Sequence, residues 1–197
     1  MRQTRSSIHQ CLHESTRADH LRLEGVLNLL DPELTRERYG RVLVGFHAFY
    51  APLEAQLQRH HRAAPLTLDF NLPRRASLLM TDLAVLGLSP AARDEALMPE
   101  IRTVSEFAGR LYVVEGAALG GQVLARHLAG KWAIDRDSGA AFFSGAGPTE
   151  TGRRWARILT WLERVAKSSA DSRDMVVAAS AAFRALEHGV RSQAGQS

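Results

Sequence analysis

The sequence predicts an all-α protein, and the spacing of its apolar residues is the main observation behind this prediction. Apolar residues recur every three or four positions along most of the chain, as they do on one face of an amphipathic helix. No stretch alternates apolar and polar residues like a half-buried strand, and no Asn-Gly or Asp-Gly pair marks a hairpin. The 197 residues suit one domain with a core over about residues 8–190 and a frayed C-terminal tail.

Caps and prolines set the predicted helix boundaries. Asp31-Pro32 should stop the first helix, because the residue before a proline avoids the helical conformation. Thr35 is a hydroxyl N-cap for the second helix, and Thr103 with Glu106 forms a capping box. We expect helices over residues 8–30, 35–61, 74–86, 103–128, 152–167 and 171–189, and a short one after Ser89-Pro90.

Composition excludes several classes of protein. With 45% hydrophobic and 23% charged residues, the chain is an ordinary globular sequence, and its one cysteine excludes a disulfide framework. It contains no apolar run of the roughly 18 residues that cross a bilayer, and its first residues lack the apolar core of a signal peptide. We therefore expect a cytoplasmic location and no membrane partner.

Charge gives no sign of nucleic-acid binding. The 25 Lys and Arg residues exceed the 21 Asp and Glu residues by only four. The arginines are scattered and mostly stand beside acidic residues, as in Arg36-Glu37-Arg38. Because nucleic-acid-binding proteins usually gather basic residues on one face, a mixed solvated surface is the better interpretation.

The helix predicted over residues 103–128 contains an unusual number of glycines. Gly109, Gly116, Gly120 and Gly121 each cost about 1 kcal/mol relative to alanine inside a helix. A phosphate-binding loop is excluded, because no Lys-Ser or Lys-Thr follows Gly121 and no strand precedes the segment. The bare backbone can serve either a flat ligand or close packing between helices, and the residues alone do not decide between these alternatives.

His20 is the second candidate, because Glu24 follows it by one helical turn on the same face. A metal-bound imidazole usually donates its other N–H to a carboxylate, carbonyl or water. The pair therefore suits an axial metal ligand and the group that orients it. A surface histidine beside a surface glutamate is the alternative interpretation.

Several segments, in order, carry a resemblance to a known family. They are residues 12–24 (LHESTRADHLRLE), Tyr39, 46–54 (FHAFYAPLE), Arg75, 79–82 (LMTD), 109–124 (GRLYVVEGAALGGQVL), 142–145 (FFSG) and 152–155 (GRRW). The chain resembles the heme oxygenases over about residues 10–190, particularly the bacterial subgroup encoded beside bacteriophytochromes. The resemblance implies a helical bundle that holds haem between a proximal helix and a glycine-rich distal helix.

The resemblance also implies roles for the two candidates. His20 would be the axial ligand of the haem iron, and Glu24 would accept a hydrogen bond that orients its ring. Gly116, Gly120 and Gly121 would form the distal helix, whose close backbone would direct bound oxygen toward one edge of the ring.

Further residues match positions that grip the haem propionates in the family. Tyr112 could contact a propionate or a distal water, and Arg153 and Arg157 stand four apart on one predicted helix, as a pair of propionate ligands would. Two solvated arginines are the alternative for this pair. Ala117 departs from the family where many members have a water-ordering Asp, and His13 replaces a lysine that often faces a propionate.

The implied activity is a haem-degrading monooxygenase that uses haem as both cofactor and substrate. It would turn haem, dioxygen and external electrons into biliverdin, ferrous iron and carbon monoxide. A ferredoxin, a flavodoxin-type protein or a reductase would supply the electrons, and a bacteriophytochrome could receive the biliverdin. A non-catalytic haem or tetrapyrrole binder, motivated by Ala117, and a helical interaction scaffold are the alternatives.

Overall fold

The computed structural model describes residues 7–91 and 98–194, and within these ranges it contains helices and no strand. The helices are α1 (Ile8–Leu27), α2 (Arg36–Ala63), α3 (Arg75–Val85), α4 (Val104–Trp132), α5 (Ala141–Ser144), α6 (Pro148–Val165) and α7 (Ser169–Ala194). The predicted all-α class is confirmed.

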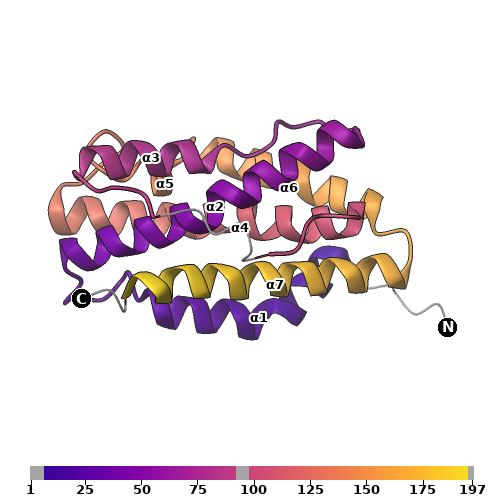
Figure 1. The fold of residues 1–197 in the computed structure, drawn as a ribbon, viewed down its shortest axis with the longest axis horizontal. Coiled ribbons are helices and arrows are strands. Elements are labelled where there is room, and N and C mark those ends of the chain that lie inside the picture. The colour runs from indigo at the N-terminus through magenta and orange to yellow at the C-terminus, as the bar shows by residue number, and fades with distance from the viewer. Residues whose placement is uncertain (1–6, 92–97, 195–197) are drawn as a thin grey trace.

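The long helices form a bundle in which α7 is central. It packs against α1, α2 and α4. Figure 1 shows that α1, α4 and α7 all run in one direction, while α2 and α6 run the opposite way. This common direction means that positions along α1 and α4 can be compared by counting turns.

The predicted N-caps are confirmed, with one difference in detail. The Thr35 hydroxyl accepts from the N–H of Arg38 at 3.2 Å, and the Thr103 hydroxyl accepts from the N–H of Glu106 at 3.1 Å. The Glu106 carboxylate, however, reaches the N–H of Arg102 at 2.7 Å rather than that of the capping threonine. The box is therefore one residue wider than the sequence pattern indicates.

Several predicted ends were wrong by a few residues. Asn28 adopts the left-handed conformation and ends α1 three residues before the predicted Leu30. α4 continues four residues past 128, α6 begins with Pro148 in its first turn instead of at 152, and α7 extends beyond 189. The short helix predicted after Ser89-Pro90 falls on residues 92–97, outside the described part of the chain.

The four-residue helix α5 was missed, and buried polar side chains hold it in place. Asp82 accepts hydrogen bonds from the N–H groups of Ala141 at 2.6 Å and Phe142 at 2.9 Å. Arg75 donates to the carbonyl of Phe142 at 2.9 Å. Because one helical turn is unstable by itself, these contacts from α3 place α5 against the bundle.

Glu54 of α2 acts as a cap for a different helix. α3 has no side-chain cap of its own, and the buried Glu54 carboxylate accepts from the N–H groups of Arg75 and Ala76 at its start. Burial raises the pKa of Glu54 from its ordinary 4.5 to about 7, although both N–H contacts oppose the shift.

The raised pKa of Glu54 predicts a pH-dependent loss of stability. The folded protein binds a proton that the unfolded chain releases, so the free energy of unfolding falls as pH rises from about 4.5 through about 7. Glu54→Gln keeps an oxygen for the two N–H groups and removes the titration. Between about pH 5 and pH 8, the wild type should therefore lose on the order of 2 kcal/mol more than the variant.

Urea unfolding at both pH values measures this difference, and Glu37→Gln on the exposed start of α2 is the matched control. The control should follow the wild type. Parallel pH profiles for the wild type and Glu54→Gln would contradict the account.

Candidate functional site

α1 and α4 both pack against α7, and this common neighbour sets their register. A Cβ on Gly109 of α4 would meet Met175 of α7, and the His20 ring of α1 meets Phe183, eight residues further along α7. Gly116 follows Gly109 by seven residues on a helix that runs in the same direction as α1 and α7, so Gly116 and His20 stand at about the same level along the bundle. Tyr112 of α4 is buried, and burial raises the pKa of its phenol.

His20 is exposed on α1 and is bordered on two sides. Its Nδ1 lies 3.6 Å from a carboxylate oxygen of Glu24, which is within ion-pair range but longer than a hydrogen bond. Its ring meets that of Phe183 of α7 edge to face, with 5.8 Å between ring centroids. Phe183 is buried, and its ring limits how the His20 ring can turn.

The glycines of α4 differ in what surrounds them: some are closely packed and one is open. A Cβ on Gly109 would lie 2.2 Å from the carbonyl oxygen of Met175, and one on Gly121 would lie 3.1 Å from that of Phe143. These two glycines allow close packing against α7 and α5. At Gly120, by contrast, no heavy atom of the described residues would lie within 4 Å of an added Cβ.

Two exposed apolar residues stand beside the open glycine on α4. Leu119 and Val123 are 41% and 48% exposed. On α1, Leu21, which follows His20 in the sequence, is 55% exposed. Gly116 is half-covered by the Trp155 ring of α6, 3.5 Å from where its Cβ would stand. Large apolar side chains left in water beside bare main chain suit a surface that binds something apolar.

Arg153 and Arg157 project from α6 into solvent and share one partner. Arg157 donates to Glu150 at 2.9 Å, and Arg153 lies 3.8 Å from the same carboxylate. The side chain of Arg157 is 46% exposed, and that of Arg153 is 72% exposed. An exposed carboxylate is a weakly held partner that a stronger anion can replace, so both interpretations of this pair remain compatible with the contacts.

Arg154, also on α6, has a much stronger partner, which the sequence did not predict. Arg154 grips the buried Glu115 with two hydrogen bonds, Nε to Oε2 at 2.8 Å and Nη2 to Oε1 at 2.6 Å. It also donates to the carbonyl of Asn71 at 2.7 Å. Glu115 and Arg154 are 39 residues apart, so no local spacing in the sequence could reveal this pair.

Aromatic rings gather where α1, α4 and α6 meet. His9 lies 5.9 Å from the ring of Trp155, 6.4 Å from that of Tyr112 and 6.4 Å from that of His13. The sequence pointed to His13 and Tyr112 but not to His9. These ring contacts place Tyr112 of α4 next to α6, the helix that carries Arg153.

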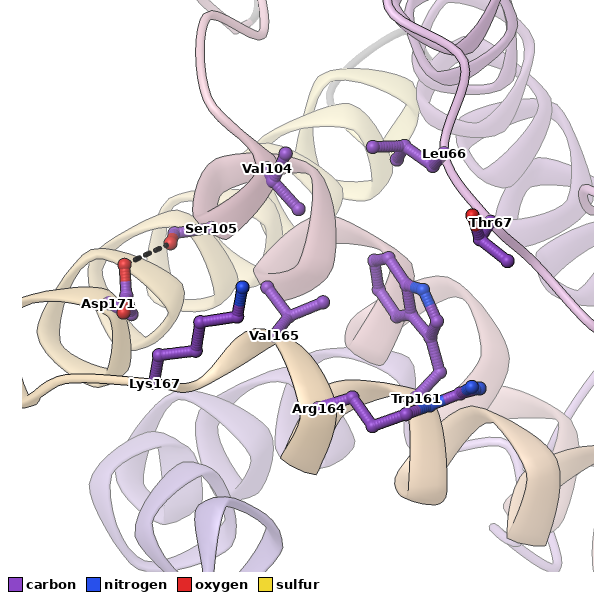
Figure 2. A pocket seen from close by; sticks show the side chains of 9 residues that line it. All are labelled: Leu66, Thr67, Val104, Ser105, Trp161, Arg164, Val165, Lys167 and Asp171. Atoms are coloured by element: carbon purple, nitrogen blue, oxygen red, sulfur yellow. Dashed lines mark hydrogen bonds between the residues drawn. The ribbon is translucent and has the colours of Figure 1, made fainter.

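A hollow of about 410 Å³ lies elsewhere, between the start of α4, the end of α6 and the start of α7. Figure 2 shows Trp161 and Val165 on one side of it and Ser105 bonded to Asp171 on another. None of the sequence-predicted site residues lines it. The described residues also contain no cluster of three or more His, Cys, Asp or Glu side chains placed to hold a metal, and none of their helices is long and apolar enough to span a membrane.

The arrangement of the helices matches that of solved heme oxygenases. The NO- and CO-bound heme oxygenase from Neisseria meningitidis superposes with a TM-score of 0.78 at 21% identity, covering 98% of this chain and 94% of that one. The heme oxygenase from Leptospira interrogans gives 0.74 at 18% identity, covering 95% and 100%. These likenesses define the fold as the all-α heme oxygenase fold.

Sequence comparison establishes the family. The heme oxygenase family model matches residues 6–191. The heme oxygenase of Xanthomonas campestris pv. campestris (strain 8004) is 32% identical over 151 residues, which are 75% of this chain and 85% of that protein. The chain belongs to the heme oxygenase family. Membership supports an enzyme that degrades haem, with haem as substrate and cofactor and dioxygen as the second ligand.

The two kinds of glycine in α4 predict opposite effects of the same substitution. Gly120→Ala should raise the free energy of unfolding of the haem-free protein by about 0.5–1 kcal/mol, because alanine favours the helix and its Cβ meets nothing. Gly109→Ala should lower it by roughly 1–3 kcal/mol, because its Cβ would meet the main chain of α7. Chemical unfolding of the two variants beside the wild type measures both. A stabilising Gly109→Ala or a strongly destabilising Gly120→Ala would show that the packing is wrongly assigned.

Proposed function

We propose that this chain cleaves haem with dioxygen and external electrons to biliverdin, ferrous iron and carbon monoxide, with His20 as the axial iron ligand. The observation that carries the proposal is the placement of His20 on α1 level with Gly116 on α4, beside an open Gly120. A flat molecule bound to this imidazole would meet side-chain-free main chain of α4 at Gly120.

The donors and surfaces of this region fit haem. A single imidazole is a sufficient protein ligand for an iron that brings four ligands of its own, as the proximal histidine of globins shows. The exposed Leu21, Leu119 and Val123 offer apolar contact to a large flat ring. When bound, haem supplies the iron that activates dioxygen, and the protein supplies position and shelter.

Glu24 and Phe183 would hold the His20 ring from two sides. A carboxylate near Nδ1 favours the tautomer that carries its proton there, which leaves Nε2 to bind the metal. The 3.6 Å separation allows a hydrogen bond after a small movement of either exposed side chain. The edge of Phe183 limits ring rotation, so the metal-binding nitrogen keeps one direction.

Gly116, Gly120 and Gly121 would make the opposite wall. Gly120 brings bare main chain to the ligand, while Gly121 supports the wall from behind by letting Phe143 of α5 approach closely. With a wall of main chain, shape rather than an acidic side chain would select the edge of the ring that is oxidised. Ala117, which is exposed on this wall, supplies no proton, so ordered water must do so.

Tyr112, Arg153 and Arg157 would meet the propionate edge of haem. Arginine forks bind carboxylates in two-point contacts, and a propionate would replace the exposed Glu150 as their partner. The physiological partners we propose are a ferredoxin, a flavodoxin-type protein or a reductase as electron donor, and a bacteriophytochrome as acceptor of biliverdin. The resemblance of the ordered motifs to the phytochrome-associated subgroup is what supports the second partner.

Ala117 favours a second candidate function, a non-catalytic haem or tetrapyrrole binder. Loading the protein with haem without oxygen, then adding reductant and air, separates the two functions. The enzyme should lose its Soret band and gain the long-wave absorbance of a bilin. A persistent Soret band with no bilin would favour the binder.

His20→Ala should abolish both the imidazole-ligated spectrum of the haem complex and turnover, because the iron loses its protein ligand. Added imidazole should restore the spectrum in part, and Glu24→Ala should weaken activity without abolishing it. Absorption spectra of the reconstituted variants and single-turnover assays measure these effects.

His188→Ala, which removes an exposed histidine of α7, is the matched control and should behave like the wild type. If His20→Ala converts haem as the wild type does without added imidazole, the ligand is assigned to the wrong residue.

A further inference from the structure

We propose that the ion pair of the buried Glu115 and the partly buried Arg154 is a positioning device that sets which edge of bound haem faces α4. The inference rests on the proposed function and extends it to two residues outside the proposed binding set. The pair connects the distal helix to the helix of the proposed propionate ligands. Neither residue is expected to touch haem.

The geometry of the pair restricts how α6 can turn. Two parallel hydrogen bonds join the planar guanidinium of Arg154 to both oxygens of Glu115, so the contact fixes an orientation as well as a distance. A third bond from Arg154 reaches the carbonyl of Asn71, and its guanidinium lies 5.8 Å from the Phe70 ring centroid. The hydrogen bonds to Glu115 raise the pKa of Arg154, so its guanidinium stays charged.

Burial makes this contact different from the other ion pairs of α6. The Glu115 side chain is 4% exposed and that of Arg154 is 26% exposed. By contrast, Nη2 of Arg164 in α6 lies 3.5 Å from Oδ1 of Asp69, which is in the same loop as Phe70 and Asn71. Both of these side chains are about half exposed. An exposed pair of that kind contributes little to stability and permits movement, whereas losing one partner of a buried pair is costly.

The neighbours of the pair are the residues that the proposed function uses. Glu115 immediately precedes Gly116 in α4, and Arg154 stands between Arg153 and Trp155 in α6. Trp155 in turn approaches Gly116 and packs 5.5 Å from the Tyr112 ring. The pair therefore fixes the glycines of α4 relative to Arg153 and Arg157 of α6.

This rigidity matters because both propionates of haem lie at one edge of the ring. Residues that grip them decide how the ring is turned in its site, and so which edge faces Gly120. If α6 could rotate or slide, Arg153 and Arg157 would bind the propionates with the haem ring in more than one orientation. A distortion of about 1 Å at such a point can change reaction rates about 100-fold.

The test replaces both members of the pair so that folding and positioning can be separated. Exchanging a buried ion pair for apolar residues of similar size is often neutral or stabilising, so Glu115→Leu/Arg154→Met should fold as well as the wild type. Arg154→Lys, which keeps the charge but loses the two-point fork, is the conservative variant. Arg164→Met, which removes the exposed pair between α6 and the same loop, is the matched control.

Haem release and product identity are the two readouts. We expect the double variant to release haem to excess apomyoglobin about tenfold faster than the wild type, which corresponds to ~1.4 kcal/mol. Single turnover should give more than one biliverdin isomer by chromatography, where the wild type gives mainly one. Arg154→Lys should fall between them, and Arg164→Met should match the wild type.

Each result has one meaning. A double variant that unfolds with the wild-type denaturant midpoint, releases haem at the wild-type rate and gives the wild-type isomer would overturn the inference, because the pair would then be structural only. A wild type that binds haem through His20 but forms no biliverdin would refute the proposed function, and haem release would still test the positioning role. If the double variant does not fold, Arg154→Lys with unchanged release and unchanged isomer overturns the inference by itself.

Discussion

The packing of α1 and α4 against α7 is the constraint on which the proposed site depends. It sets the register of α1 and α4, two helices that run in the same direction, because Gly109 packs on Met175 of α7 and the His20 ring meets Phe183 further along it. This register brings His20 to about the level of Gly116. If α1 slid by one turn along α7, the proposed iron ligand would stand at a different level from the glycines of the proposed distal wall.

α4 shows how one helix can be both tightly packed and open. At Gly109 and Gly121, the missing side chains let neighbouring main chain approach, while at Gly120 the same absence leaves free surface. Polar side chains behind the helix make this possible, since Asp82 holds α5 in place behind Gly121. The stability lost to glycine inside a helix is thus offset by packing on one face, and the other face stays available for a ligand.

Much of the fold could be predicted from the sequence because helices are specified locally. The N-caps Thr35 and Thr103 and the His20–Glu24 spacing follow from residues three or four positions apart. The features that were missed depend on residues far apart in the chain. Glu54 caps a helix 21 residues away, and Glu115 meets its arginine 39 residues away. Apolar periodicity contains no information about such partners, and the four-residue helix α5 is too short to give a periodic signal.

A crystal structure of the protein grown with haem tests the central claim most directly. The account predicts iron bound to Nε2 of His20, with the main chain of α4 at Gly116 and Gly120 against the opposite face of the ring. Iron bound to His13 or His127, or haem seated in the hollow between α4, α6 and α7 with side chains filling the space beside Gly120, would contradict it.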